Sequence, residues 1–435
     1  MSLTFAGMLV NVALDVLIAA RLGAGQAADA LIIALSFPLL VDTVTRESAK
    51  FSLVPIFVEY RTERPEAYSA FISALINAAL VGGVVLTVLA AVTAPWIVRA
   101  LGPGMTQEGS VQATRLLWAC APLLLFAPVV TVQGVLLNSE ERFSRVALRN
   151  ATAPGIVVLV LLATWGRADV ATWIAGAYGA GFALYFAILA DGMRRSPHFE
   201  YHWTAWPTRA DVKEIQAALS WPSLGFTARR ITRLLERSIA SLVAVGGVSA
   251  YYFAFRIFSG LQTIIGTSIA TTGLPNLSAR NASAHRWEAR SIVRDQVRWV
   301  VLLALPAVVA VLLFSEPIIE IVYRHGAFGD DAVRRTEKLL FWFGPGIVFI
   351  CLNPPLNAVL YSMKEYQLVF WNMLAMGVLN ILLAWVLAVE WNLGLSGIAM
   401  SVSIVAVCSA CIIPLLIRRA GLPLWGSLTP NVHDG

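Results

Sequence analysis

The chain has 435 residues, of which 58% are hydrophobic and 13% are charged, with a net charge of +6. This composition excludes a soluble globular domain, and apolar runs of about 20 residues recur to the end, which predicts an all-α, polytopic membrane protein. The basic residues are scattered through short loops, in the pattern that orients membrane helices, so nucleic-acid binding is not expected.

Hydropathy predicts about twelve transmembrane helices. The first apolar run begins at Leu3 with no basic region or cleavage site ahead of it, so we expect a retained helix and not a signal peptide. The predicted spans are Leu3–Ala20, Leu31–Phe57, Phe71–Val98, Leu116–Leu137, Ala151–Trp165, Trp173–Ala190, Ile215–Val243, Ser249–Leu274, Val300–Val322, Leu339–Leu360, Leu368–Val389 and Leu395–Ile417. The loops hold about fifteen Lys and Arg on one side of the membrane and about six on the other, which predicts that both termini are cytosolic.

An internal repeat predicts the architecture. The stretch Leu116–Phe143 aligns with Leu339–Tyr366 at one constant offset. The informative matches are Pro122 with Pro345, Ser139 with Ser362 and Phe143 with Tyr366. At the same offset Leu137 meets Leu360, and elsewhere the repeat pairs Ser36 with Arg256. Such a duplication predicts two pseudo-symmetric lobes of about six helices around a central cleft that holds the substrate. The expected division is an N-terminal lobe at 1–195, a cytosolic connector at 196–213, a C-terminal lobe at 214–420 and a short cytosolic tail at 421–435.

The seventh predicted span is unusually charged. It contains Arg229, Arg230, Arg233, Glu236 and Arg237, and the spacing of residues 230, 233 and 237 places those three arginines on one helix face. Glu236 lies one turn from Arg233, so we expect part of this charge to be paired internally. An interfacial helix with snorkelling arginines is the alternative.

The second predicted span carries Asp29, Asp42, Arg46, Glu47 and Lys50. Asp42 and Arg46 have the i, i+4 spacing of a favourable helical ion pair, and a structural and a functional role are equally open for them.

Two further charged residues lie alone in apolar segments. Asp15 in the first span is either a group that responds to protons or ions or the partner of a neighbouring arginine. Arg256 is the one charge in the stretch Val248–Ser278, and it is expected to face protein or a water-filled cavity because a guanidinium facing lipid is costly. A snorkelling or structurally paired arginine is the alternative.

No pattern of a soluble enzyme is present. There is no Walker A sequence, and the four cysteines lie in apolar runs. The histidines lie in loops or the tail with no metal-ligand spacing beyond His198 and His202, a pair that is expected to be solvated in the central connector. We therefore expect no enzymatic activity, no metal and no cofactor, with proton or monovalent-ion coupling as an open possibility.

Two stretches resemble the MurJ/MviN family of lipid-linked-precursor flippases, within the multidrug/oligosaccharidyl-lipid/polysaccharide exporter superfamily. Gly23–Arg61 is similar to the family's second helix, through Asp29, Pro38, Glu47 and the closing sequence Val54-Pro55-Ile56-Phe57-Val58-Glu59-Tyr60. Val248–Ser278 is similar to its eighth helix, with Arg256 at the cavity arginine and Leu274-Pro275-Asn276-Leu277-Ser278 at its close, and Tyr323–Phe328 resembles a family loop.

The chain also departs from the family pattern. Met8 and Leu14 stand at the positions of two first-helix arginines, Asp42 at the second-helix arginine and Phe255 at an acid before Arg256. Two further C-terminal helices that are usual in the lipid II branch are not expected. The resemblance therefore implies a divergent member.

The resemblance implies a flippase in the bacterial cytoplasmic membrane that moves a polyprenyl-diphosphate-linked saccharide, lipid II-like or another envelope precursor, to the outer leaflet by alternating access. Candidate substrate-binding residues are Arg256, Arg230, Arg233, Arg237 and Arg46, and candidate coupling or ion-pairing residues are Asp15, Asp29, Asp42, Glu47 and Glu236. Envelope-synthesis enzymes are possible partners. The alternatives are a cation-coupled multidrug exporter of the same superfamily and a non-transporting membrane scaffold of an envelope-synthesis complex.

Overall fold

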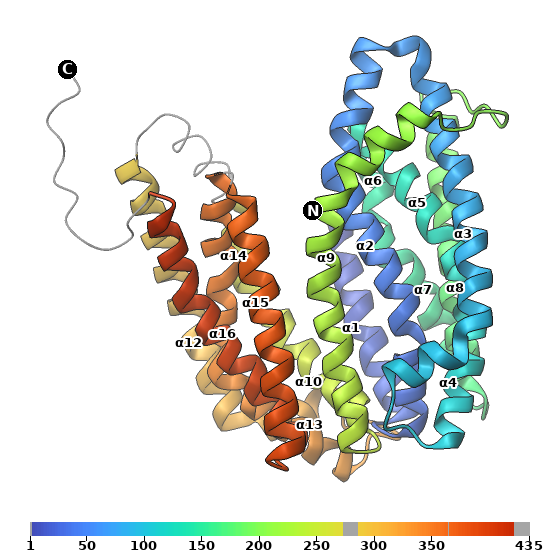
Figure 1. Ribbon diagram of the computed structural model, residues 1–435. Coiled ribbons are helices and arrows are strands. Elements are labelled where there is room, and N and C mark those ends of the chain that lie inside the picture. Colours follow the sequence, from blue (N-terminus) through green and yellow to red (C-terminus); the bar gives the residue numbers. More distant parts are fainter. Residues whose placement is uncertain (1, 273–285, 364, 422–435) are drawn as a thin grey trace, which may run out of the picture. The chain divides into compact units, whose positions relative to one another are not determined.

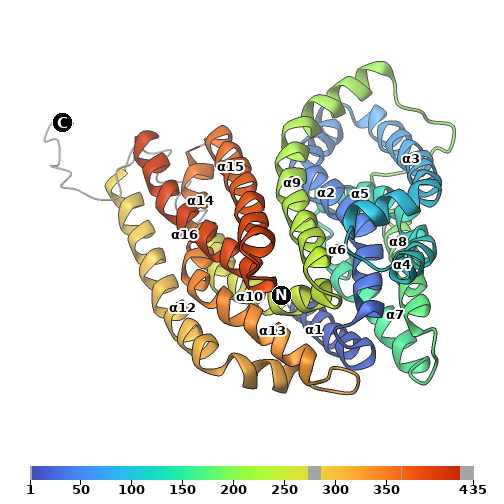
Figure 2. The same ribbon diagram turned by 60° about the horizontal axis from the view of Figure 1, so that its bottom comes forward.

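The computed structural model describes residues 2–272, 286–363 and 365–421, and within them the chain forms helices and no strand. These residues fold into two compact units (Figures 1 and 2). Unit 1 is Met1–Ser249 with Val322–Ala332, and unit 2 is Ala250–Ile321 with Val333–Gly435.

Unit 1 is built around α2, which packs against α3, α4, α5 and α9. Its helices are α1 Ser2–Leu22, α2 Gln26–Glu63, α3 Pro65–Leu101, α4 Gln107–Cys120, α5 Pro122–Ser139, α6 Phe143–Ala147, α7 Arg149–Ala163, α8 Val170–Arg194 and α9 Arg209–Val243. Helix α9 begins inside the segment predicted to be the connector, and by packing it belongs to unit 1. The lobe boundaries predicted from the repeat stay a prediction.

Unit 2 contains the remaining helices. They are α10 Gly247–Leu261, whose first turn lies in unit 1, the π-helix η1 Gln262–Thr267, α12 Arg286–Tyr323, α13 Asp330–Phe343, the 3-10 turn η2 Gly344–Gly346, α14 Ile347–Ser362, α15 Tyr366–Trp385, the π-helix η3 Val386–Glu390 and α16 Leu395–Arg419. The predicted family motif Leu274–Ser278 and most of the tail at 421–435 lie outside the described residues.

The predicted membrane fold is confirmed, although the number of spans is not. Nine helices in the described part of the chain are long and apolar enough to cross a membrane. The other three predicted spans coincide with α1, with α7, which has only 15 residues, and with α9, which is rich in charge. The count of about twelve therefore stays a prediction.

The aligned segments of the repeat have the same local structure. Helix α4 is followed by a break and by α5, which begins at Pro122, and α13 is followed by the 3-10 turn that contains Pro345 and then by α14. Both second helices end at the paired serines, Ser139 and Ser362, whose hydroxyls donate to the carbonyl three residues earlier at 2.8 and 2.7 Å. The equivalent backbone bonds, from Arg142 N to Leu137 O at 2.8 Å and from Glu365 N to Leu360 O at 3.0 Å, close both ends.

Close helix packing in unit 1 depends on a small residue. A Cβ at Gly83 of α3 would clash with the Leu125 carbonyl oxygen of α5, whereas a Cβ at the neighbouring Gly82 would meet nothing within 4 Å. Small residues allow helices in lipid to approach in this way. The cores are apolar, and one of them joins Phe57 of α2 and Ile72 of α3 to Leu136 of α5.

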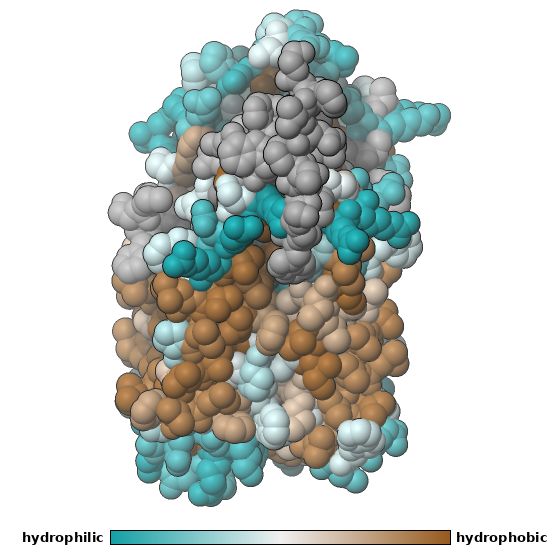
Figure 3. Space-filling view, turned by 90° about the vertical axis from the view of Figure 1, so that its left-hand side faces the viewer, coloured by the Kyte–Doolittle hydropathy of each residue, from teal (hydrophilic) through white to brown (hydrophobic). Residues whose placement is uncertain are grey.

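Apolar side chains also cover the outside of the units. Figure 3 shows a band of hydrophobic residues with polar residues above and below it. On α12 this surface is formed by large exposed residues, Leu302, Leu303, Leu305, Val309, Leu313, Phe314 and Ile321. Such a band is the surface that a bilayer covers.

Candidate functional site: a polar seam between helices α2 and α9

Polar side chains lie at several heights along the contact between α2 and α9, which we call the seam. The first of them is Asp29 in the first turn of α2. The Asp29 carboxylate is 4% exposed and accepts three hydrogen bonds, from Gly246 N at 2.7 Å, Ser249 N at 2.7 Å and the Ser249 hydroxyl at 2.6 Å. Gly246 has a φ of +79°, which favours glycine. Because these amides lie at the N-terminus of α10, Asp29 caps that helix from α2, where its negative charge is favoured.

Arg237 forms the next level of the seam. Its Nη1 donates to the Ser36 hydroxyl of α2 at 2.8 Å, and the Ser36 hydroxyl donates to the Ile32 carbonyl at 2.6 Å. The next residue of α9 is bonded to the end of α3, since the Ser238 hydroxyl donates to Leu101 O at 2.9 Å. Arg237 is therefore held on α2, on the predicted charged face of α9.

The remaining charges of α9 lie along the same helix. Glu236 is fully buried and pairs with Arg233 at 3.2 Å, which confirms the predicted internal pairing. Arg233 is half-buried and Arg230 is exposed. The side chain of Arg229 lies outside the described part of the structure.

A last level lies at the other end of α2. The Tyr60 hydroxyl donates to Glu214 Oε2 of α9 at 3.4 Å, and its ring stacks on Phe71 with 4.0 Å between centroids. Burial, together with the nearby carboxylates of Glu214 and Asp211, raises the pKa of Tyr60, so the phenol stays protonated and donates at neutral pH. Helix α9 is thus bonded to α2 near both of its ends.

The predicted pairing of Asp42 with Arg46 is wrong. Asp42 pairs instead with Arg149, the first residue of α7, and Arg46 pairs with its neighbour Glu47 at 2.5 Å. The Arg149 guanidinium also lies over the rings of Phe182 and Tyr185 of α8, at 5.4 and 5.7 Å from their centroids. A cation buried among helices prefers such partners to the more exposed local pair.

Arg149 is a site residue that the sequence pattern does not single out. It stands with Arg142 and Arg145 among the basic loop residues that predict the orientation of the chain. The structure places all three against α8: Arg142 donates to Gly192 O at 3.0 Å, and Arg145 pairs with Asp191 at 2.8 Å. Their spacing, 142, 145 and 149, is that of one helix face and was the available signal.

The other two candidates are located but remain untested as sites. Asp15 is buried in α1, with 4% of its surface exposed. Arg256 is half-buried in α10, and its backbone carbonyl accepts from the Ser259 hydroxyl at 3.3 Å. The cleft-facing orientation of Arg256 stays a prediction.

The chemistry of the seam is that of anion binding and ion pairing. Guanidinium groups offer several N–H donors in a planar fork that matches phosphate oxygens. No group of three or more His, Cys, Asp or Glu side chains within residues 2–272, 286–363 and 365–421 is arranged to hold a metal ion.

Comparisons with known proteins agree on one family. The family model described as "Lipid II flippase MurJ" matches residues 18–429. The lipid II flippase MurJ of Burkholderia cenocepacia is 24% identical over 432 residues, which is 96% of this chain and 82% of that protein. The probable lipid II flippase MurJ of Thermotoga maritima is 23% identical over 402 residues, with 92% and 80% covered.

Solved structures share the fold. A lipid II flippase MurJ in an inward closed conformation aligns with a TM-score of 0.84 at 20% identity, covering 96% of this chain and 86% of that one. An inward-facing multidrug resistance MATE family transporter of the MOP superfamily aligns with a TM-score of 0.83 at 15% identity, covering 95% and 94%.

Proposed function

The chain belongs to the family of the lipid II flippase MurJ, and from this premise we propose that it moves a polyprenyl-diphosphate-linked saccharide across the bacterial cytoplasmic membrane. Its relatives carry the name of lipid II flippases, so lipid II or a close analogue is the proposed cargo. Movement from the inner to the outer leaflet proceeds by alternating access, in which a wet passage for the sugar opens to each side in turn while the lipid tail stays in the bilayer.

The observation that carries the proposal is the row of arginines on α9. The spacing of Arg230, Arg233 and Arg237 places them on one face of α9, and Arg237 donates to the Ser36 hydroxyl of α2. A diphosphate needs several charge-assisted donors, which guanidinium groups provide. In this proposal Arg237 and Arg230 of α9 bind the diphosphate. Arg256 of α10 is a separate candidate for a phosphate contact, and Arg46 is paired with Glu47.

The acidic residues have a different role in the proposal. Asp29 and Asp42 hold helices together through Gly246, Ser249 and Arg149, and Glu236 orients Arg233. For Asp15, which is buried in α1, the proposed role is ion or proton coupling. A cation-coupled drug exporter of the same superfamily would instead use its acids to bind a cationic cargo, and the involvement of Asp29 and Asp42 in these bonds favours an anionic cargo.

The test is lipid translocation by purified protein in vesicles. A fluorescent polyprenyl-diphosphate saccharide is placed in both leaflets, and a membrane-impermeant quencher reports how fast the inner pool becomes accessible. We expect Arg237→Ala to slow this transfer by about tenfold or more, because a charge-assisted bond to the diphosphate is lost. The matched control is Arg99→Ala, at an exposed arginine near the end of α3, which should transfer at the rate of the unchanged protein.

Two results would overturn the proposal. Transfer by the unchanged protein no faster than by empty vesicles would favour the scaffold alternative. Transfer of a cationic drug but not of the lipid-linked sugar would favour the exporter.

A further inference from the structure

A ladder of polar side chains on α3 holds the loop between α8 and α9, residues 195–208. Ser69, Ser73 and Asn77 are spaced four residues apart and therefore lie on one face of the helix. The Ser69 hydroxyl accepts from Glu200 N at 3.0 Å, and the Ser73 hydroxyl accepts from His202 N at 2.9 Å.

Asn77 completes the ladder with both ends of its amide. Its Nδ2 donates to Trp203 O at 3.0 Å and to Ala205 O at 2.7 Å, and its Oδ1 accepts from the Tyr201 hydroxyl at 2.5 Å. Backbone groups of Glu200, His202, Trp203 and Ala205 are thus bonded to side chains of α3, although the loop has no regular secondary structure.

The same loop turns aromatic side chains outward. Trp203 is 78% exposed, Trp206 59% and Tyr201 49%, within only six residues. Large aromatics gathered on a surface indicate an interaction site. In membrane proteins Trp and Tyr concentrate where the apolar core of the bilayer meets the head groups, because their rings are amphipathic.

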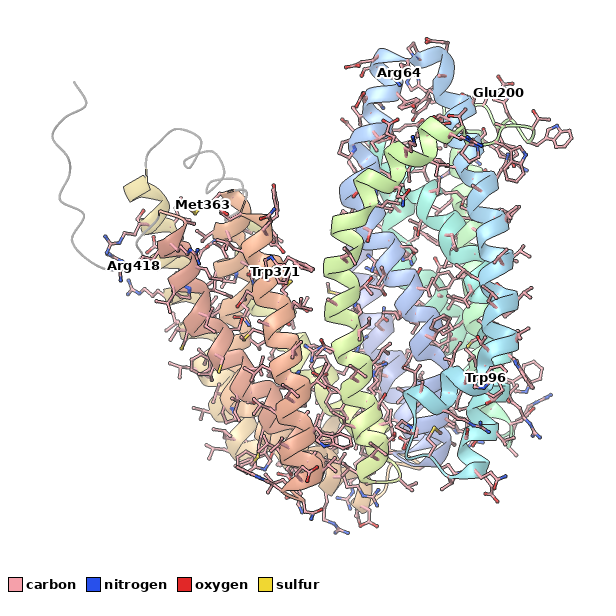
Figure 4. The ribbon with its side chains drawn as sticks, viewed as in Figure 1. Arg64, Trp96, Glu200, Met363, Trp371 and Arg418 are labelled. Atoms are coloured by element: carbon pink, nitrogen blue, oxygen red, sulfur yellow. The ribbon has the colours of Figure 1, made fainter. Side chains whose placement is uncertain are left out.

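The position of the loop along α3 identifies what covers these aromatics. One turn beyond Asn77 begins a row of exposed apolar residues on α3: Leu80, Val81, Val84, Val85, Val88, Leu89, Val92 and Trp96. From Leu80 to Trp96 this row extends about 24 Å at the helical rise, close to the thickness of the hydrocarbon core. In Figure 4, Glu200 of the loop lies at the same end of unit 1 as Arg64, and Trp96 lies toward the other end.

Charges beside the loop fit a lipid surface. Arg194 and Arg209 flank it and are exposed, as is Arg195, which also pairs with Asp191. Juxtamembrane basic residues are attracted to anionic lipids. The carboxylates of Glu200 in the loop and Asp211 in the first turn of α9 oppose this attraction, and Asp191 pairs with Arg195.

We propose that the α8–α9 loop lies in the head-group layer of the bilayer, with Trp203 and Trp206 inserted among phospholipids and with a preference for anionic head groups. This surface includes none of the arginines proposed to bind the cargo. It also fixes the start of α9, since Thr208 at the end of the loop caps that helix through reciprocal bonds with Asp211 at 3.2 and 2.7 Å.

The experiment places an environment-sensitive NBD fluorophore on the loop. Thr204 is exposed and is changed to cysteine in a protein whose accessible cysteines, Cys408 and Cys411, are alanine, while the buried Cys120 and Cys351 are retained. The matched controls carry the probe at Leu80, in the lipid-facing row, and at Thr62, an exposed position near the end of α2.

The vesicles contain phosphatidylcholine and phosphatidylglycerol, with a spin label on the lipid head group. We expect this label to quench the probe at residue 204 at least about twice as strongly as the probe at residue 62. Adding Trp203→Ser and Trp206→Ser should reduce that quenching to the level at residue 62. Changing Arg194 and Arg209 to Gln should abolish the stronger quenching in phosphatidylglycerol relative to pure phosphatidylcholine.

One outcome overturns the proposal whatever the transport activity. If the probe at residue 204 is as exposed to water as the probe at residue 62 in both kinds of vesicle, while the probe at residue 80 reports lipid, the loop projects into water. Its aromatics would then be available to a protein partner instead.

Discussion

Asp42 in the middle of α2 forms an ion pair with Arg149 at the start of α7, and both side chains are largely buried, with 8% and 14% of their surfaces exposed. Phe182 and Tyr185 of α8 complete the enclosure of the guanidinium. The pair therefore joins three helices of unit 1 at a place where a single charge without its partner would be costly.

Removing one member of this pair should destabilise the protein strongly. We expect Arg149→Met to lower the free energy of unfolding by roughly 3 kcal/mol, because it leaves the Asp42 charge uncompensated. The double variant with Asp42→Asn should recover much of that loss, which thermal unfolding in detergent measures. The control is Arg46→Ala, at the arginine that the sequence pairs with Asp42, where a loss below about 1 kcal/mol is expected for a partly exposed pair. Equal losses at Arg46 and Arg149 would contradict the assignment.

Asp29 should be the main attachment of α2 to the start of α10. Asp29→Ala leaves the amides of Gly246 and Ser249 without their acceptor, at roughly 1–3 kcal/mol for each buried donor. Ser249→Ala removes only the hydroxyl bond and should cost about 1 kcal/mol. Thermal unfolding of the two variants beside Asp169→Ala, an exposed acid that accepts from Trp173, gives the comparison. We expect the loss of stability to decrease in the order Asp29→Ala, Ser249→Ala, Asp169→Ala. A reversed order would contradict the proposed role of Asp29 in attaching α2 to α10.

The contact between α3 and α5 predicts a contrast between adjacent glycines. Gly83→Ala places a methyl group against the Leu125 carbonyl. We expect this overpacking to lower the free energy of unfolding by roughly 1–3 kcal/mol, which is measured as a lower unfolding temperature. Gly82→Ala, one residue earlier, enters open space and should be neutral or slightly stabilising, because alanine is the better helix former. If both substitutions change the unfolding temperature by the same amount, then Gly83 is not required for the close approach of α3 and α5.

Arg256 is expected to be required for transport and not for folding. In the vesicle assay, Arg256→Ala should abolish lipid transfer at normal protein levels, and Arg256→Lys should restore it only in part, because lysine lacks the planar fork that binds two phosphate oxygens. Circular dichroism and elution from a size-exclusion column monitor the fold. Full transfer by Arg256→Ala would end the assignment, and loss of the folded protein would favour a structural role.

The basic residues of the loops predict the orientation. A reporter fused after Arg419 should be active in the cytosol, because the side with about fifteen Lys and Arg faces inward. A phosphatase reporter, active only outside the cytosol, is the control at the same position. Activity of the phosphatase there would show that the orientation or the number of spans is wrong.

The sequence by itself determined the membrane class, the helical fold and the family. Long apolar runs have one stable outcome in lipid, since every backbone polar group must be satisfied inside a helix. The repeat also located real local features, because the helices break at Pro122 and Pro345 in the two aligned segments, and the second helix of each segment ends at the paired Ser139 and Ser362. Interactions between near neighbours could be predicted as well, as with Arg233 and Glu236.

Only the tertiary structure decided which distant charges meet. Asp42 lies one turn from Arg46 in sequence but pairs with Arg149, and Asp29 lies far along the chain from the amides of Gly246 and Ser249 that it binds. Hydropathy and helical spacing carry no information about the partner on another helix. In a low-dielectric interior, burial makes the enclosed pair stronger than the exposed local one, and which pair becomes enclosed depends on how the helices pack.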